Sequence, residues 1–412
     1  MQQIRHTTSI ESFFAIIGRS AVTVVTIAVL AELCSVPVLR AYARFHRDPL
    51  VPQESPAYDN EKWGREFWVE QSAFWTRART SYLPFMVWGV RKWHGKFINT
   101  DDTEMGTWRR TVDARGEVCK NAAVRKVWVF GGSTVYGIGT PDWATIPSYL
   151  SREVNMDPTA CIEVTNLGAE GYVTNQEVIL LIQQLKAGRK PDIAIFYDGV
   201  NESLVGGFSP GNPAEHWNFQ MIKARVERSG DSKLAWLTNS HFFQLIRLLA
   251  GNDGQEGVPT ISDGELPAKA QATLQNYETN MKLVHMLATA YGFKTYFFWQ
   301  PVLAFGAKPL VPFEQELEKA RSKELGGRVH RGLEAVYQEA ETRAASTGSF
   351  VFLGHVFDEV KETLYVDEFH LDPRGNQIIA HAIAQAAQLS RIDENPTEQH
   401  GAINHRGQLP SP

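Results

Sequence analysis

The segment 127–137 constrains this chain most, because an apolar strand there runs into two glycines and a serine. Four consecutive apolar residues, 127–130, are typical of a strand buried on both faces of a parallel sheet. Gly131 and Gly132 let the backbone approach a ligand, and Ser133 then presents a hydroxyl at the carboxyl edge of the sheet. A serine that only caps the following helix is the alternative interpretation.

From residue 124 onward, short apolar runs alternate with helical stretches. The runs predict five strands, at 127–130, 162–167, 193–197, 294–299 and 350–353. The stretches between them predict helices at 143–154, 175–187, 269–291, 314–346 and 374–389. Strands that alternate with helices indicate an α/β fold, in which helices cover both faces of an open parallel sheet.

The N-terminal residues 13–39 are largely apolar, with Arg19 and Glu32 as interruptions. The uninterrupted run 20–31 is too short to cross a bilayer, but the whole stretch reaches that length if the Arg19 side chain extends to an interface. No clean signal-peptidase site follows, so residues 1–47 are predicted to be an uncleaved transmembrane anchor. We expect a single-pass membrane protein whose main domain lies outside the cytoplasm, in the periplasm. A buried amphipathic helix is the alternative, and the flanking basic residues do not settle the orientation.

Three further regions follow this leader. Residues 48–120 hold six of the eleven tryptophans and are predicted to pack on the main domain as an aromatic-rich extension, with sugar stacking or membrane contact as alternatives. The main domain is expected at 121–394, with an insert at 203–266 that covers its pocket. Residues 395–412 are polar and predicted to be disordered.

Charge and cysteine content exclude some classes of partner. The net charge is −5 and no basic cluster follows residue 50, so we expect no binding to nucleic acid. The three cysteines show no C-x-x-C spacing, which excludes a thiolate zinc site. Cys119 and Cys161 each precede a predicted strand, and the sequence leaves open whether they pair.

Glycines and polar residues gather in four segments of the α/β region. The first strand ends at Ser133, the second at the segment 166–171, and the third at the segment 197–202. The segment 367–372 comes just before the last helix. Because the carboxyl ends of parallel strands meet at one edge of a sheet, these four segments are predicted to form one site.

The residue types in these segments suit acyl transfer. The Ser133 hydroxyl needs a base to accept its proton, and His370 is the candidate. Asp367, three residues earlier, can accept the Nδ1–H hydrogen bond that orients the imidazole. The backbone N–H groups of Ser133 and Gly168 and the side-chain amide of Asn201 are predicted to stabilise the oxyanion. This chemistry needs no metal and no other cofactor.

The four segments resemble those of the SGNH (GDSL) hydrolase family over roughly residues 124–389, by motif order rather than by continuous similarity. The resemblance implies a flavodoxin-like three-layer α/β/α fold with a parallel sheet. Members of the family are esterases, lipases, carbohydrate acetyl esterases and some acyltransferases. The residues that match the family's nucleophile, oxyanion residues and D-x-x-H pair are Ser133, Gly168, Asn201, Asp367 and His370.

The sequence departs from the family pattern at two positions. The usual G-D-S has Gly132 at its centre, and the usual G-x-N-D ends in Glu202. Neither departure removes a catalytic group. Two other hydrolase and nucleotide motifs are excluded, since Ser133 lies in no G-x-S-x-G and Ile138 stands where a phosphate-binding loop needs lysine.

The leading hypothesis is therefore a membrane-anchored serine ester hydrolase, lipase-like or a carbohydrate deacetylase, that acts on a small-molecule or glycan ester. One alternative is an O-acyltransferase that modifies a surface polysaccharide. Another is a non-catalytic binding module on a degenerate hydrolase fold, which the departure at Gly132 suggests. The sequence indicates neither the acyl and alcohol groups of the substrate nor the oligomeric state.

Overall fold

The computed structural model of the protein describes residues 3–45, 55–77, 80–157, 159–208, 240–249, 262–322 and 327–389, with isolated positions between 215 and 226. The chain divides into two compact units, which are described separately. The smaller unit comprises Met1–Val51 and Asn218–Val258, and the larger comprises Pro52–Trp217 and Pro259–Pro412. The expected C-terminal tail and much of the expected insert lie outside the described residues.

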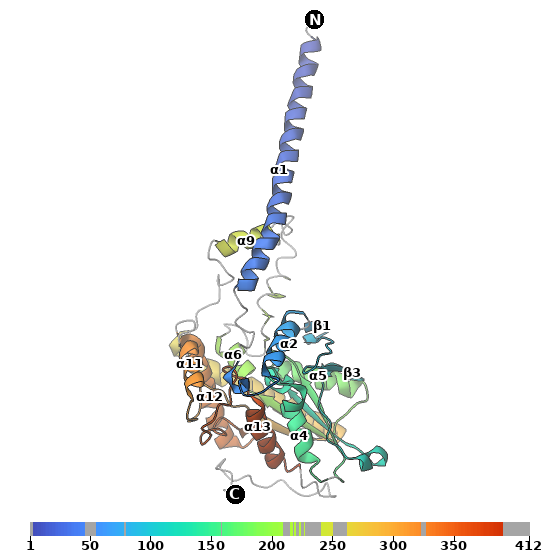
Figure 1. Ribbon diagram of the computed structural model, residues 1–412, viewed down its shortest axis with the longest axis vertical. Coiled ribbons are helices and arrows are strands. Elements are labelled where there is room, and N and C mark those ends of the chain that lie inside the picture. The colour runs from blue at the N-terminus through green and yellow to red at the C-terminus, as the bar shows by residue number, and fades with distance from the viewer. Residues whose placement is uncertain are drawn as a thin grey trace. The chain divides into compact units, whose positions relative to one another are not determined.

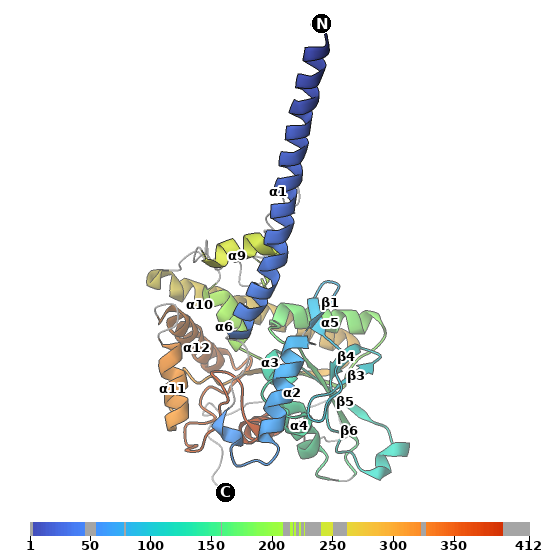
Figure 2. The same ribbon diagram turned by 45° about the horizontal axis from the view of Figure 1, so that its top comes forward.

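The larger unit is built on a parallel sheet of five strands, which Figures 1 and 2 show between layers of helices. The strands are β5 (Arg125–Gly131), β6 (Ile162–Gly168), β7 (Ile193–Asp198), β8 (Lys294–Trp299) and β9 (Val351–Phe352). Their order across the sheet is β6-β5-β7-β8-β9, and all four neighbouring pairs are parallel. This flavodoxin-like order confirms the predicted fold class. It reverses direction at β5, and ligands bind at such a switch point.

Helices cover both faces of the sheet. α4 (Ile146–Val154) packs with α13 (Pro373–Ala386) on one face, while α5 (Thr174–Lys186), α6 (Val200–Phe208), α10 (Leu266–Tyr291) and α12 (Arg328–Thr347) pack together on the other. The predicted helical region 314–346 consists of two helices, α11 (Pro312–Arg321) and α12. Gly327, with φ of 74°, begins α12 from a left-handed conformation that a continuous helix does not allow.

Alternate side chains of β5 enter two separate cores. Val127 and Val129 belong to a cluster of buried aliphatic side chains from α4 and α13. Phe130 points the other way and stacks on Phe196, which stacks on Phe297, with ring centroids 4.7 and 4.9 Å apart. Both faces are apolar, which explains why the strand reads as a continuous apolar run.

The aromatic-rich extension consists of one helix and two hairpins. They are α2 (Gly64–Arg77), β1 (Thr80–Leu83) with β2 (Val87–Val90), and β3 (Thr100–Thr103) with β4 (Gly106–Arg109). In the turn between β1 and β2, Phe85 adopts a positive φ of 67°.

The smaller unit contains a long helix, α1 (Gln3–Phe45), and a short one, α9 (His241–Leu249), which packs against it. Within α1, the window Val22–Tyr42 has a mean hydropathy of 2.2 and is 6% buried. In length and composition it is the one helix among the described residues that suits a membrane anchor or a signal sequence. The segment 218–258 of the expected insert groups with α1, and its predicted role as a lid remains untested.

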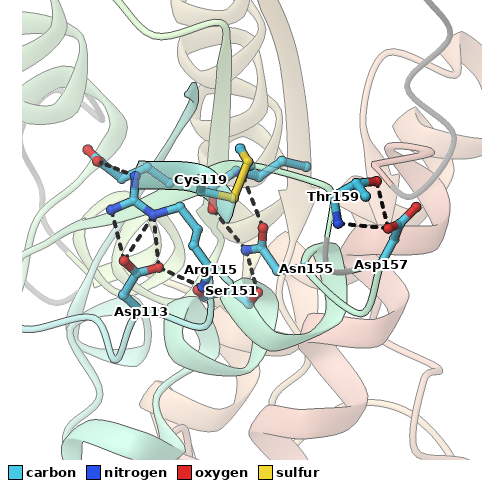
Figure 3. The surroundings of a disulfide bond; sticks show 10 residues. Asp113, Arg115, Cys119, Ser151, Asn155, Asp157 and Thr159 are labelled. Carbon is cyan, nitrogen blue, oxygen red and sulfur yellow. Dashed lines mark hydrogen bonds and ion pairs between the residues drawn. A yellow bond between two sulfur atoms is a disulfide. The ribbon is translucent and has the colours of Figure 1, made fainter. Parts of the chain in front are cut away.

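A disulfide joins Cys119 to Cys161 and resolves the pairing that the sequence left open. Cys119 lies in a short 3-10 helix (Glu117–Asn121), and Cys161 immediately precedes β6. Figure 3 shows Asn155 beside this bond. The Asn155 amide donates to the carbonyl of Ile162, and its oxygen accepts the Ile162 N–H, at 2.8 and 3.0 Å. The start of β6 is thus fixed by one covalent bond and two hydrogen bonds.

Replacing both Cys119 and Cys161 with serine is expected to lower the free energy of unfolding by about 2–4 kcal/mol, because the disulfide closes a long loop in the unfolded chain. The two cysteines are separated by 42 positions in sequence. Urea unfolding of the variant and of the oxidised protein, followed by far-ultraviolet circular dichroism, measures the difference. Equal midpoints and slopes would contradict a stabilising role for this bond.

Candidate active site

Ser133 begins a one-turn helix, α3 (Ser133–Tyr136), directly after β5. Two backbone hydrogen bonds form the turn: Tyr136 N–H donates to the Gly132 carbonyl, and Gly137 N–H donates to the Ser133 carbonyl. A Cβ on Gly131 would lie 2.6 Å from the Tyr197 carbonyl oxygen, so the chain can turn this close to β7 only with glycine there. The turn leaves the Ser133 side chain partly exposed.

The Ser133 hydroxyl contacts a histidine instead of capping its own helix. Ser133 Oγ lies 2.8 Å from Nε2 of His370, and Nδ1 of His370 lies 2.6 Å from Oδ2 of Asp367. The other Asp367 oxygen accepts the backbone N–H groups of Phe369 and His370, at 2.9 and 2.8 Å. These bonds hold the carboxylate, imidazole and hydroxyl in one line, as general-base activation of a serine requires.

The electrostatics of the pair favour a charged carboxylate beside a basic imidazole. Burial alone would lower the pKa of His370, but the charge of Asp367 and its hydrogen bond raise that pKa above its usual value. Burial would raise the pKa of Asp367, but the His370 charge and the hydrogen bonds to its carboxylate hold that pKa below its usual value. The imidazole is therefore a stronger base than an isolated one, which suits proton abstraction from serine.

A compact loop carries Asp367 and His370 to the sheet edge. Val366 N–H donates to the His370 carbonyl, and Asp372 N–H donates to the Leu364 carbonyl, at 3.0 and 2.7 Å. Asp372 also caps α13 through the Gly375 N–H at 2.7 Å. Burial raises the pKa of this capping carboxyl to about 7.

A buried ion pair between Glu314 and Lys308 contacts the start of the same loop. The Glu314 side chain is fully buried, and its Oε1 accepts the backbone N–H groups of Leu364 and Tyr365 at 3.0 and 3.2 Å. Its Oε2 lies 2.6 Å from Lys308 Nζ. Removing either charge would leave the other buried and unpaired, so we regard this pair as part of the frame that positions His370.

The predicted role of Gly168 in the oxyanion site is wrong in detail. Its N–H donates to Oδ1 of Asn166 at 2.9 Å and is therefore occupied. Glycine is needed at position 168 for another reason. A Cβ there would lie 2.3 Å from the backbone nitrogen of Tyr136, too close for any other residue. The buried Asn166 amide also donates to the Val135 carbonyl at 2.9 Å. Gly168 and Asn166 together hold α3, and with it Ser133, against β6.

Asn201, predicted as an oxyanion residue, lies beside the turn that carries Ser133. Its Nδ2 donates to the Tyr172 carbonyl at 2.7 Å. A Cβ on Gly132 would lie 2.2 Å from that same nitrogen. The departure from G-D-S at Gly132 thus has a structural reason, because glycine makes room for the Asn201 amide next to Ser133.

Gly171 is a candidate oxyanion donor that the sequence reasoning missed. Gly171 adopts a positive φ of 69° and directly precedes Tyr172, whose carbonyl accepts the hydrogen bond from the Asn201 amide. Its backbone N–H, like that of Ser133, has no hydrogen-bond partner within the described ranges. The signal in the sequence was the second glycine of the segment 166–171, which marks a turn that only glycine adopts easily.

Glu202 accounts for the second departure from the family pattern. One of its oxygens accepts both the N–H and the hydroxyl of Thr174 at 2.8 Å, and the other accepts the Gly199 N–H at 2.9 Å. This carboxylate joins the segment after β6 to the segment after β7. It fixes Asn201 from the adjacent position in the chain.

The aromatic-rich extension holds the same edge of the sheet. Trp88 Nε1 donates to the Glu170 carbonyl at 2.7 Å, and the Tyr172 hydroxyl donates to the Trp88 carbonyl at 2.5 Å. The buried Arg109 guanidinium pairs with Asp142 at 2.7 Å and donates to the carbonyls of Gly137 and Thr140. The segment 170–172, after β6, and the segment 137–142, after α3, are therefore both held by contacts from residues 80–110.

A cavity of about 210 Å³ lies in the larger unit, at the end of β8. Its lining includes Leu303, Phe305, Lys308 and His330, and includes neither Ser133 nor His370. The Leu303 N–H donates to the Glu368 carbonyl at 3.1 Å, so one wall of the cavity adjoins the loop that carries His370.

A fluorophosphonate probe is expected to label the protein covalently at Ser133, because the Ser133 hydroxyl lies within hydrogen-bond distance of a basic imidazole, that of His370. His370→Ala should slow labelling by about 10³-fold or more, since the serine then lacks its base. Mass spectrometry of the modified peptide identifies the labelled residue. Labelling at another serine, or an unchanged rate in the histidine variant, would contradict the predicted activation.

Comparison with known proteins gives relatives only at the level of structure. No protein-family model matches the sequence, and no curated protein matches it. A similar solved structure is LAE5, an α/β hydrolase from the Lake Arreo metagenome, with 14% identity and a TM-score of 0.33. The match covers 65% of this chain and 97% of LAE5.

Two further solved structures belong to ester-hydrolase groups. A putative lipolytic protein of the G-D-S-L family from Desulfitobacterium hafniense is 12% identical with a TM-score of 0.32, over 64% of this chain and 98% of that one. A catalytic mutant of the acetylxylan esterase Axe2 from Geobacillus stearothermophilus is 13% identical with a TM-score of 0.33, over 66% and 95%.

Proposed function

We propose that this protein is a serine ester hydrolase that works through an acyl-enzyme on Ser133. The observation that carries the proposal is the continuous line of hydrogen bonds from Ser133 through His370 to Asp367, at 2.8 and 2.6 Å. A serine that only capped a helix would direct its oxygen to a backbone N–H of that helix. Here it meets an imidazole whose other nitrogen contacts a carboxylate.

In the first half-reaction, Ser133 Oγ attacks the ester carbonyl and its proton passes to Nε2 of His370. The charge of Asp367 stabilises the imidazolium that forms. His370 then gives this proton to the leaving alcohol oxygen as the carbon–oxygen bond breaks. In the second half-reaction, His370 takes a proton from water as the water oxygen attacks the acyl carbon. His370 then returns this proton to Ser133 Oγ as the bond between that oxygen and the acyl carbon breaks, which releases the acid.

The oxyanion is stabilised by donors from three segments in this proposal. They are the backbone N–H groups of Ser133 and Gly171 and the amide of Asn201. The contacts at Gly132 and Tyr172 support the placement of the Asn201 amide beside Ser133. Donors fixed in advance lower the barrier because they need no reorganisation as charge develops. None of these steps uses a metal or another cofactor.

We infer that the hydrolase unit works outside the cytoplasm, anchored by α1 in a single pass. The apolar window Val22–Tyr42 supports an anchor. The Cys119–Cys161 disulfide supports an oxidising compartment such as the periplasm, because such bonds are rare in the cytosol. The substrate is then an ester of a small molecule or of a glycan.

A transferase would use the same acyl-enzyme and differ only in the acceptor. A sugar hydroxyl in place of water would give an O-acyltransferase for a surface polysaccharide, and product analysis with an added glycan separates the two. The binding-module alternative loses its one support, since Gly132 accommodates Asn201 rather than marking a decayed site.

Ser133→Ala is expected to reduce turnover of a short-chain nitrophenyl ester by about 10³-fold or more, because no other group replaces the nucleophile. The assay uses the full chain in detergent, and circular dichroism checks that the variant is folded. Turnover that persists in the folded variant would remove the proposed function.

The value of kcat/KM should rise with pH, with a midpoint above about 6.5. His370 must be neutral to act as a base, and its pKa is raised above the usual value for histidine. Asp367→Asn removes the charge that raises this pKa, so burial then lowers it and the midpoint should move to lower pH. The rate at the plateau should fall by about 10³-fold or more, since the imidazole loses its orienting partner. An unmoved midpoint would contradict the pairing.

Gly132→Ala is expected to lower kcat by about 10²-fold, because the new Cβ displaces the Asn201 amide from the oxyanion. Gly264→Ala is the matched control, since a Cβ there meets nothing within 4 Å. Steady-state kinetics of both variants separate kcat from KM. If Gly132→Ala keeps the kcat of the control, Asn201 does not act beside Gly132.

A further inference from the structure

An acidic side chain interrupts the apolar surface of α1. Glu32 lies inside the window Val22–Tyr42 and ends the uninterrupted apolar run 20–31. Large apolar side chains on either side of it are exposed, among them Leu30 and Leu33. A carboxylate at such a position is unfavourable in a membrane unless donors satisfy it.

The donors come from the beginning of α9. Oε1 of Glu32 accepts the His241 N–H at 2.8 Å and lies 2.6 Å from its Nδ1, while Oε2 accepts the Phe242 N–H at 2.9 Å. The first N–H groups of a helix have no acceptor within the helix, and the positive end of its dipole favours an anion. Glu32 and the start of α9 therefore satisfy each other.

Ser35, one turn further along α1, is buried, unlike most of the apolar surface of this helix. Ser35 is 1% exposed, and its hydroxyl donates to the Ala31 carbonyl at 2.6 Å, so it needs no donor or acceptor from water. A small side chain at this position lets a second helix approach closely. Figures 1 and 2 show α9 lying across α1 rather than along it.

The outer side of α9 is apolar and exposed. Phe242, Ile246 and Leu249, at helical spacing, are 41%, 42% and 77% exposed, and the neighbouring Phe243 is 37% exposed. Such a group of side chains is unfavourable in water. These side chains adjoin the exposed apolar surface of α1 in the same compact unit, so contact with lipid would suit both surfaces.

We propose that α9 is an interfacial helix, which lies at the boundary between headgroups and acyl chains of the bilayer. The part of α1 that precedes Glu32, residues 13–31, then crosses the bilayer, and Glu32 lies at the boundary itself. Glu32 holds it there by capping its N-terminus. A short helix that crosses a membrane-spanning helix and exposes phenylalanine and leucine fits this position. In this proposal α9, which lies within the insert 203–266 that was expected to cover the pocket, is part of the membrane attachment.

A fluorescent probe at position 243 tests this proposal in the full chain. The exposed free cysteine, Cys34, is first changed to serine, and Phe243→Cys is then labelled with an environment-sensitive nitrobenzoxadiazole maleimide. Lys186→Cys, on the exposed surface of α5, is the control. Both proteins are reconstituted in vesicles of phosphatidylcholine and phosphatidylglycerol, and quenching by nitroxide-labelled lipid is compared with quenching by aqueous iodide.

The Phe243→Cys probe should be quenched several-fold more by the nitroxide lipid than the control, and several-fold less by iodide. Adding Glu32→Ala should move its quenching towards that of the control, because α9 then loses its attachment. Iodide quenching equal to that of the control would overturn the membrane position of α9. Lipid quenching that Glu32→Ala leaves unchanged would overturn the role of Glu32.

Discussion

The hydrogen bond between Ser133 Oγ and His370 Nε2 joins two residues that are 237 positions apart in sequence, and the architecture of the larger unit serves to make it. One partner comes from the turn after β5 at the switch point of the sheet. The other comes from the loop before α13, which packs beside α4. A shift of 1 Å in either support would break the line of bonds, since hydrogen bonding depends steeply on distance and angle. The surrounding contacts therefore hold Ser133 and His370 at the distance and angle that this hydrogen bond requires.

The contacts that hold this geometry come from polar groups buried at the edge of the sheet. Asn166 ties α3 to β6, Glu202 ties the segments after β6 and β7 together, and Glu314 holds the loop that ends at His370. Each of the two carboxylates accepts several hydrogen bonds, and the Asn166 amide accepts one and donates another, so none pays the full desolvation cost of burial. The extension adds Trp88 and Arg109 to this frame. Its tryptophans are thus part of the support for the site, in addition to filling a core.

The sequence predicted the sheet and the three residues of the hydrogen-bonded line because both leave strong local signals. A buried parallel strand is a continuous apolar run, and the strand ends carry the polar residues that gather at one edge. Asp367 and His370 are close in sequence, so their spacing also suggested their contact. The role of Gly168 was misjudged because a glycine gives the same signal whether it frees a donor or admits a neighbouring backbone. Asn166, Glu202 and Glu314 were missed because their partners lie far along the chain, and no local pattern reveals such pairs. The α1–α9 contact was missed for the same reason.

In the proposed reaction Ser133 carries the acyl group during turnover. Rapid acidification of the full chain during turnover of an acetyl ester, followed by peptide mass spectrometry, measures this directly. We predict a mass increase of one acetyl group on the peptide that contains Ser133. Turnover without any acylated peptide, or acetyl on a different residue, would contradict it.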